Sequence, residues 1–352
     1  MIAMRKCLHT CLLVLLVLSG EWLYSQDAHF SQFYSTPLQV NPAMTGVYDG
    51  KLRFTNNYRT QWTSIGKGYK TIHTSLDVPV GKTDVKNNYF GVGAMIYQDK
   101  AGDAGFTSTV IEGSLSYVTA MDDVGDHYFS IGFQGGLNQN SLDLSKTTWD
   151  SQWNGDTYDP ALPTFESIQL QQFAYLDFNA GLMYFYVPDG NNSLALGASM
   201  SHVGSPNVSF IIRQEAPLRS KFNIHGSGDL SVNKENMTWI QPRFLVSLQG
   251  KQKEIVAGGF LKNKVQFKSR YTNYKKEAYF LIGGFYRYKD AAILAARFEY
   301  NTVGLGISYD LNTSNLSNLA GSASAFEINL SYVMYVKRGE RAKNFNKMPR
   351  FL

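Results

Sequence analysis

FAYLDFNAGLMYFYV, residues 173–187, carries apolar or small side chains at every second position, with polar or glycine residues between them at its centre. One face carries the apolar or small residues Ala174, Leu176, Phe178, Ala180, Leu182, Tyr184 and Tyr186. The other face carries Asp177, Asn179 and Gly181. A period of two residues is typical of a β-strand with one apolar face. The stretch is also much longer than the roughly five or six residues of an ordinary strand in a soluble sheet.

The same alternation recurs through the chain, for example in YFGVGAMIYQ (89–98), VGLGISYD (303–310) and FEINLSYVMY (326–335). Long strands in an even number are typical of bacterial transmembrane barrels, whereas a soluble β-sandwich alternates over shorter strands. We therefore predict an all-β fold, a transmembrane β-barrel of the outer-membrane type with about fourteen antiparallel strands, over residues 51–336. The expected strands are 51–60, 68–80, 87–99, 105–120, 126–138, 171–187, 192–203, 218–231, 237–249, 252–262, 277–288, 291–300, 302–311 and 324–336.

The connections between these strands differ in length. Residues 139–170, 204–217 and 312–323 form long odd-numbered connections, which would face outside the cell if the barrel begins on the periplasmic side. The tenth connection, KVQFKSRYTNYKK at 264–276, is long although it is even-numbered. That exception leaves the strand count around residues 252–290 open.

The N-terminal residues have the layout of a secretory signal peptide. Arg5 and Lys6 precede the apolar run from Leu12 to Leu18, and Ser25 offers a small residue for cleavage before Gln26. We expect residues 1–25 to be removed, and Cys7 and Cys11, the only cysteines, to go with them. The mature chain would then form neither disulfides nor cysteine metal sites.

Charge and composition exclude several functional classes. Removing Arg5, Lys6 and Glu21 with the leader changes the net charge from +5 to +4 (+5 − 2 + 1), which is mild. No basic helix accompanies it, so we expect no nucleic-acid partner. The C-terminal residues 337–352 are basic, and we expect a solvated periplasmic tail or, alternatively, one that docks to an acidic partner or peptidoglycan.

Residues 26–50 precede the first expected strand and contain FSQFYSTPLQVNPAMTG at 30–46. This stretch follows no clean period, and its two prolines oppose both a helix and a central strand. We expect it to enter or cap the lumen, beginning on the periplasmic side where the first strand begins. Its candidate contact residues are Phe30, Phe33, Tyr34, Pro37, Asn41 and Pro42.

Several charged residues fall on the registers that face the lumen. Placing such charges on the lipid face would cost about 2–4 kcal/mol each at the membrane midplane. They form either a paired network that packs a plug or a contact set for a threaded segment or solute. The set is Glu112, Asp177, Arg287, Arg297, Glu299, Asp310 and Glu327.

The fifth connection contains aromatic residues among carboxylates, a composition that suits a protein interface. The alternative is a loop that folds back onto the rim of its own barrel. The candidate partner-binding residues are Trp149, Asp150, Trp153, Asp156, Tyr158 and Phe165.

Catalysis and cofactors have little support in the sequence. The histidines show no metal-ligand spacing, and the glycine-rich stretches lack the context of a phosphate loop. Ser201 and His202 are adjacent, but adjacent residues of a strand point to opposite faces. We expect no enzyme activity, no metal and no cofactor.

Seven stretches of the chain form a recognisable set, namely QDAHFSQFYSTPLQVNPAMTG (26–46), YRTQW (58–62), GASMSHVGSPNVSF (197–210), IQPRFLVSLQG (240–250), GGFYRYKDAAILA (283–295), GISYDLNTSNLSNLAGSASAFEINLSY (306–332) and MPRFL (348–352). Together they resemble the PorP/SprF family of outer-membrane proteins. Glu327 is present, but the histidine expected just before it is absent.

The resemblance implies an outer-membrane barrel associated with type IX secretion and gliding motility. The implied partners are outer-membrane lipid and a large secreted adhesin, held through its C-terminal sorting domain. Periplasmic secretion or motility proteins are the alternative partners, and a solute-conducting porin-like channel is the competing function. A receptor with a large plug domain would need more residues before the first strand.

Overall fold

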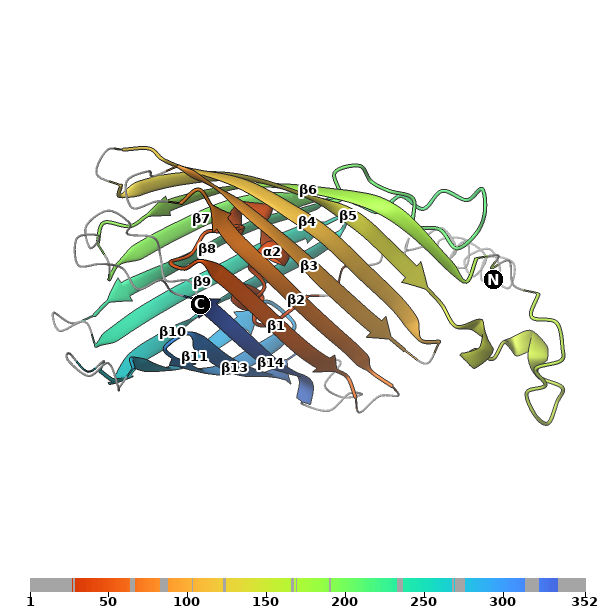
Figure 1. Cartoon of the computed structure of the whole chain (residues 1–352). Helices are drawn as coiled ribbons and strands as arrows, with labels where there is room; N and C mark the ends of the chain where they lie inside the picture. The colour runs from red at the N-terminus through yellow and green to blue at the C-terminus, as the bar shows by residue number, and fades with distance from the viewer. Residues whose placement is uncertain are drawn as a thin grey trace, which may run out of the picture.

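Within the described residues, fourteen antiparallel strands form a closed barrel in the computed structural model (Figure 1). Each strand pairs with the next along the chain, and β14 closes the barrel against β1. The strands are β1 (Leu52–Gln61), β2 (Tyr69–Val80), β3 (Tyr89–Ala101), β4 (Phe106–Ala120), β5 (His127–Ser141), β6 (Gln172–Tyr186), β7 (Ser193–Ser201), β8 (Lys221–Ser231), β9 (Thr238–Gln249), β10 (Gln252–Gln266), β11 (Ala278–Arg287), β12 (Ala291–Tyr300), β13 (Val303–Asn312) and β14 (Ala323–Met334).

The structure describes residues 27, 29–63, 67–82, 88–102, 104–122, 125–165, 168, 170–189, 191–232, 237–267, 269, 276–313 and 323–334. The predicted signal peptide and basic tail lie outside the described residues. No helix in the described part of the chain is long and apolar enough to span a membrane.

The predicted fold class is confirmed, including the number of strands. The open question at the tenth connection is resolved by β10, which continues to Gln266 and takes up part of the stretch assigned to the loop. The remaining connection, 267–277, is correspondingly shorter than expected.

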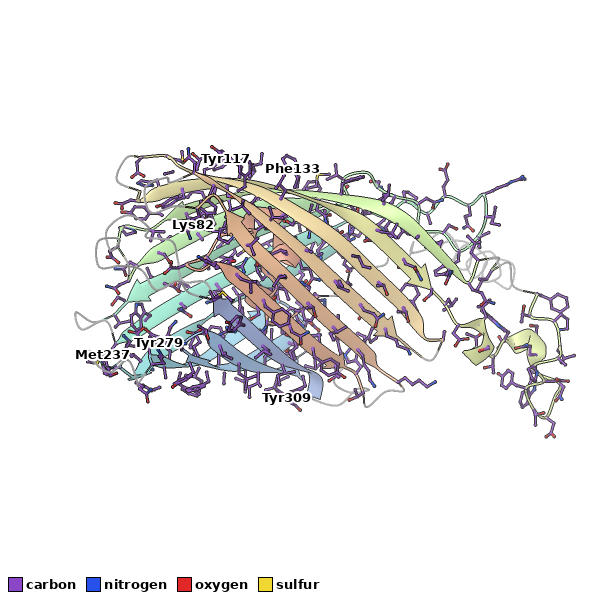
Figure 2. The ribbon with its side chains drawn as sticks, viewed as in Figure 1. Lys82, Tyr117, Phe133, Met237, Tyr279 and Tyr309 are labelled. Atoms are coloured by element: carbon purple, nitrogen blue, oxygen red, sulfur yellow. The ribbon has the colours of Figure 1, made fainter. Side chains whose placement is uncertain are left out.

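The side-chain alternation separates a lipid-facing surface from a polar lumen. In β6, Leu176 is 64% exposed and Phe178 is 55% exposed, while Asp177 between them is 1% exposed. Figure 2 shows Tyr117, Phe133 and Tyr309 projecting from the outer surface of the barrel. An apolar outside with a polar inside is the arrangement that a membrane-spanning barrel requires, because lipid solvates only the outer face.

The two mouths of the barrel differ. We call the mouth where β1 begins and β14 ends the base, and the opposite mouth the rim. The odd-numbered connections lie at the rim, including 142–171 and 202–220, and the even-numbered ones lie at the base. The connection from β5 to β6 projects well beyond the strands at the rim (Figure 1).

The N-terminal segment lies inside the barrel, where Figure 1 shows its short helix α2. It forms three single turns, η1 (Phe33–Ser35), α2 (Pro37–Val40) and η2 (Pro42–Met44). Proline is tolerated in the first turn of a helix but not in its interior, so Pro37 and Pro42 each start a turn and keep the turns short. We call the described residues of this segment, 27 and 29–51, the plug.

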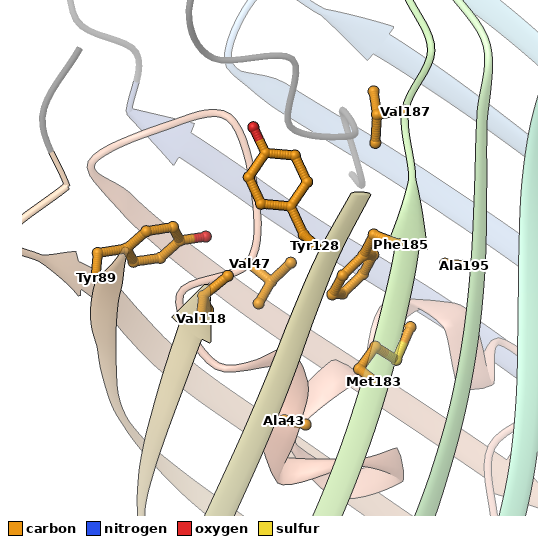
Figure 3. Packing of buried hydrophobic residues seen from close by; sticks show 9 residues of the cluster. All are labelled: Ala43, Val47, Tyr89, Val118, Tyr128, Met183, Phe185, Val187 and Ala195. Atoms are coloured by element: carbon orange, nitrogen blue, oxygen red, sulfur yellow. The ribbon is translucent and has the colours of Figure 1, made fainter. Parts of the chain in front are cut away.

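The plug completes the apolar core. Near the base, Ala43 and Val47 pack with wall residues that include Tyr128 and Phe185 (Figure 3). On the opposite wall, Phe33 and Val40 join a second cluster, whose wall members include Phe260 and Phe285. The lumen of this barrel is therefore a packed interior along these two walls rather than a bare polar channel.

Candidate functional site: the plugged lumen and the rim

The plug crosses the lumen from the rim to the base. Near its start, the Asp27 carboxylate lies 2.8 Å from His202 Nε2 and 3.5 Å from Lys221 Nζ, both at the rim. Near its end, the Tyr48 hydroxyl donates to the Asp77 carbonyl oxygen at 2.7 Å, toward the base. The expectation that the segment begins on the side of β1 is therefore wrong. A short chain can cross the whole lumen, and the ion pairs of Asp27 hold its start at the rim.

A polar cluster on β1, β13 and β14 holds the upper part of the plug. The Glu327 carboxylate accepts the backbone N–H groups of Ser31 at 2.5 Å and Gln32 at 2.9 Å. The Ser31 hydroxyl donates to Asp310 at 2.6 Å. Arg59 forms ion pairs with both Asp310 and Glu327. All of these polar groups are buried, so each depends on the others for the hydrogen bonds that water would otherwise supply.

Arg287 extends this cluster toward β10. Its guanidinium donates to the Ser31 hydroxyl at 2.6 Å and pairs with Asp310 at 3.2 Å and with Glu254 at 3.3 Å. It also pairs with the more exposed Asp290 at 2.9 Å. The charge-assisted bonds converge on a single plug serine, so the start of the plug has one defined position.

The plug stretch from Val40 to Thr45 docks along β4 to β8 through its backbone. The Val40 carbonyl accepts the Ser199 hydroxyl at 2.6 Å, and the Ala43 carbonyl accepts the Ser130 hydroxyl at 2.7 Å. The Thr45 carbonyl accepts the Ser116 hydroxyl at 2.6 Å. Wall serines thus supply the hydrogen bonds that an irregular buried backbone needs.

Asn41 is the central polar anchor of that stretch. Its amide nitrogen donates to the Leu182 carbonyl at 3.0 Å and lies 3.0 Å from His225 Nε2. Its amide oxygen accepts the Ala43 N–H at 2.9 Å and so caps η2. The side chain is fully buried, and replacing it would leave wall and plug groups unpaired.

Glycines in the wall let the plug backbone approach closely. A Cβ at Gly181 would lie 1.9 Å from Asn41 Oδ1, and one at Gly132 would lie 2.3 Å from the Ala43 nitrogen. A Cβ at Gly91 would lie 2.1 Å from the Thr45 carbonyl oxygen. We call Gly91, Gly132 and Gly181 the glycine wall. Their positions in β3, β5 and β6 make room for this one segment.

Asp77 holds the lower end of the plug. It accepts the Gly46 N–H at 2.6 Å and pairs with Arg53 at 2.8 Å. Arg53 also donates to the Met44 carbonyl at 2.9 Å and stacks over the Tyr48 ring at 4.7 Å. The plug is therefore held by buried charges near both mouths.

The aromatic residues of the plug pack against the barrel wall. Phe30 makes edge contacts with His73 and Tyr97. Tyr34 stacks on Phe285, and the Arg243 guanidinium lies 4.7 Å from the Tyr34 ring centroid on its face. Arg243 is 8% exposed, so this ring replaces part of its lost hydration.

The seven charged residues expected in the lumen are all buried there, in three separate groups. Arg287, Asp310 and Glu327 join the cluster around Ser31. Arg297 and Glu299 pair 3.1 Å apart nearer the base, and Lys262 lies 2.7 Å from Glu299. The third group contains Glu112 and Asp177, both near the rim on the far wall.

Several residues of the site were missed from the sequence. Arg53, Arg59 and Asp77 occupy alternate positions on β1 and β2, so the same period-two signal could have found them. The glycine wall has a weaker signal, because glycines on the lumen register are common in barrels. No local signal marks His202, which follows β7 with a positive φ of 57°.

His202 is enclosed by two carboxylates. Its Nδ1 lies 2.5 Å from Asp177, and its Nε2 lies 2.8 Å from Asp27. Burial alone would lower its pKa, but the charges and hydrogen bonds of Asp27 and Asp177 outweigh burial and raise the pKa to about 10. Conversely, burial would raise the pKa of Asp27, but His202 and Lys221 hold it well below its usual range. Both ring nitrogens are engaged, so His202 has none available to accept a proton from Ser201.

The fifth connection forms a compact excursion with an aromatic tip. Trp153 and Tyr158 form a bridge and an edge-on ring pair with centroids 5.1 Å apart. They are 49% and 47% exposed, and Phe165 is 82% exposed. Trp149 is half-buried, while Asp150 and Asp156 are exposed. The structure thus gathers Trp153 and Tyr158 at the tip, and Phe165 follows later in the same connection with a positive φ of 56°.

A metal centre is not evident in the described part of the chain, where no group of three or more His, Cys, Asp or Glu side chains could hold an ion. What the described residues do form is a closed, apolar-faced barrel with a polar lumen occupied by its own N-terminal segment. The class of protein is thus an outer-membrane-type β-barrel with an internal plug.

Comparison with known proteins places this barrel in a family. The family model for type IX secretion system membrane protein PorP/SprF matches residues 23–332, and the chain belongs to that family. It is therefore a membrane protein of the type IX secretion system. No curated protein matches the sequence.

Solved barrels resemble the chain in outline only. The toluene transporter TodX of Pseudomonas putida is 11% identical, with a TM-score of 0.46, and 88% of this chain covers 94% of that one. BamA from Haemophilus ducreyi, lacking POTRA domains 1–3, is 11% identical, with a TM-score of 0.40, and 81% of this chain covers 70% of that one. The KdgM porin in complex with oligogalacturonate is 8% identical, with a TM-score of 0.38, and 80% of this chain covers 99% of that one.

Proposed function

We propose that this protein is a non-enzymatic anchor that binds a large secreted adhesin, through its C-terminal sorting domain, at the bacterial outer membrane. It would do so as part of type IX secretion and gliding motility. The observation that carries the proposal is the plug, whose backbone N–H groups donate near the two mouths to the buried carboxylates of Glu327 and Asp77. A lumen filled in this way is poorly suited to conducting a solute, so the exposed rim is the better working surface.

The partner-binding surface in this proposal is the tip of the fifth connection. Trp153 and Tyr158 present adjacent, half-exposed rings beside the acidic residues Asp150 and Asp156. Aromatic side chains surrounded by charge are typical of the centre of a protein interface. The tip is held by its own contacts, such as the Asp159 N–H to the Gln152 carbonyl at 2.9 Å, and stands clear of the strands (Figure 1).

The first test is to extract the tagged protein from its own outer membrane in mild detergent and identify what accompanies it. A very large secreted protein at near-equal stoichiometry supports the anchor. Only periplasmic components would instead assign the protein to the secretion apparatus itself. A barrel without partners that conducts in planar bilayers would favour the channel.

The second test locates the surface. Replacing residues 149–159 by a short Gly-Ser linker should release the adhesin to the medium while the barrel still inserts. A matched control removes residues 211–215 of the seventh connection, beyond the hydrogen bond from the Val208 N–H to the Ala216 carbonyl. Equal adhesin retention by both deletions would contradict the loop assignment.

A further inference from the structure

A cavity of about 290 Å³ lies between the plug and the wall formed by β3 to β8, on the rim side. Asp27 and Gln39 of the plug border it on one side, and Val208, Phe210 and Leu218 of the seventh connection border it at the rim. Its volume is close to the lower limit of small-molecule pockets. The space is therefore large enough for a small organic group or several waters.

The lining of the cavity carries more negative than positive charge. Four carboxylates line it, on Asp27, Asp99, Glu112 and Asp177, against Lys221 and His202. The two cations are used by Asp27 and Asp177, through contacts of 2.5 to 3.5 Å. Asp99 and Glu112 are left without an ion pair among the described residues.

Asp99 and Glu112 have only neutral partners. Asp99 accepts the Thr71 hydroxyl at 2.7 Å, and Glu112 accepts the Asn179 amide at 3.2 Å. Their exposed fractions are only 9% and 3%. A buried carboxylate is normally paired with a cation or bound to a metal, so two such groups lining one cavity need an explanation.

Unpartnered amide oxygens supply an independent observation. Asn138 Oδ1 and Asn140 Oδ1 are buried and have no hydrogen-bond partner among the described residues. Both residues line the same cavity and are 2% and 8% exposed. Buried acceptors are rarely left unsatisfied, so the cavity offers hydrogen-bond acceptors to a group that brings donors.

We propose that this cavity is a receptor for an organic cation, a guanidinium or ammonium group that enters from the rim. Such a group combines positive charge with several N–H donors, which matches the two unpaired carboxylates and the two free amide oxygens. A single metal ion fits less well, because no described set of three ligand-type side chains converges on one point. The ring of Phe210, in edge contact with Phe106, adds an aromatic surface at the entrance.

The cation has two possible sources, a basic side chain of a partner segment and a free small solute. The chemistry of recognition is the same for both, and it does not depend on whether the rim holds an adhesin. The test therefore uses defined probes on the purified, folded barrel rather than any partner.

The experiment compares n-butylguanidinium with n-butylurea, its neutral isostere, by calorimetric titration of the detergent-solubilised protein. We expect butylguanidinium to bind and butylurea to bind at least about tenfold more weakly. Glu112→Gln and Asp99→Asn should each raise the Kd for butylguanidinium by about tenfold or more. Two variants are used so that a folding defect in one leaves the other informative, and thermal unfolding verifies that each is folded.

Asp229→Asn is the matched control. Asp229 also faces the lumen and accepts a neutral amide, from Gln241 at 2.7 Å, but it does not line this cavity. It should leave the Kd unchanged. Equal binding of the two probes, or binding that neither Glu112→Gln nor Asp99→Asn weakens, or no binding at about 10 mM, would overturn the proposal and leave a water-filled cavity.

A third probe, the peptide Gly-Arg-Gly, distinguishes the two sources. Tighter binding of the peptide than of butylguanidinium, with the same dependence on Glu112, would assign the site to a partner's basic side chain. Tighter binding of the free cation would assign it to a small solute. Both results require the Glu112 dependence and support the cavity as a cation receptor.

Discussion

The backbone N–H of Ser31 donates to the carboxylate of Glu327 across 2.5 Å, so the last strand of the barrel holds the segment that precedes the first. The same carboxylate pairs with Arg59. One buried side chain of β14 therefore contacts both the plug and the neighbouring strand β1, at the position where Glu327 pairs with Arg59 across the closing strand pair. This coupling explains why the plug can be an irregular segment and still have one position.

Replacing Glu327 by Gln should displace the upper part of the plug from the barrel wall. The change leaves Arg59 with only part of its buried counter-charge, and breaking such a pair costs about 3–5 kcal/mol. A Ser35→Cys reporter, at a plug position that is 4% exposed, should become reactive toward maleimide in this variant and stay protected in the parent. Glu215→Gln, at an exposed position of the seventh connection, is the control. The same protection and stability in both variants would argue against this role of Glu327.

An alanine in the glycine wall should displace the plug more selectively. Gly181→Ala and Gly132→Ala place a methyl group within 1.9 Å and 2.3 Å of plug atoms. We expect maleimide labelling of the Ser35→Cys reporter to rise by about tenfold or more, with an overpacking cost of about 1–3 kcal/mol. Gly113→Ala is the control, because its Cβ would meet nothing closer than 4.0 Å. Labelling that is equally slow in all three would show that the wall can relax.

The contribution of the Asp27–His202 pair to stability should depend on pH, and it should be lost at both high and low pH. The pKa of His202 is raised from 6.5 to about 10, so its contribution is complete below pH 6.5 and is lost as the pH rises through 10. The pKa of Asp27 is lowered from 3.8, so its contribution is present above pH 3.8 and is lost as the pH falls further. The shift of His202 corresponds to a stabilisation on the order of 5 kcal/mol, shared between Asp27 and Asp177.

A double-mutant cycle of Asp27→Asn and His202→Gln measures this pair. The coupling free energy, from denaturant unfolding of the four proteins, should be favourable at neutral pH and approach zero above pH 10. The cycle cancels the effect of Asp177, which both backgrounds retain. A coupling that does not change between pH 7 and the alkaline limit would refute a charged pair.

A charge on the outer face should destabilise the barrel in its membrane. Leu115 lies within β4, points outward and is 51% exposed. Leu115→Lys should cost about 2–4 kcal/mol of unfolding free energy in lipid vesicles, because a charge near the midplane is poorly solvated. Phe165→Lys, in the fifth connection, should change the unfolding free energy little. Equal effects of the two would contradict the placement of β4 across the bilayer.

The fold was largely predictable from the sequence. Alternation at a period of two is a local property, and in FAYLDFNAGLMYFYV it assigns Leu176 to lipid and Asp177 to the lumen without knowledge of any neighbour. The signal is strong here because a barrel exposes one face to lipid and the other to a polar interior along every strand. The predicted end of β10 was too early, because the last lumen-facing residues of this strand are basic and their sequence resembles that of a loop.

The site was less predictable, because its contacts join distant parts of the chain. That Glu112 and Glu327 face inward follows from register, but their partners do not. Ser31 contacts Glu327, and Asp27 contacts His202, but the two residues of each pair lie far apart in the sequence. No local sequence pattern indicates such a contact.

By itself, then, the sequence determined the number of strands, their faces and an irregular segment before the first of them. Only the tertiary structure decided that this segment runs from the rim to the base. It also decided which wall glycines leave room for the segment and which buried carboxylates lack a cation. The physical reason is that strand periodicity depends on neighbouring residues alone. The seating of the plug depends instead on the closure of the barrel, which brings β1 and β14 together around it.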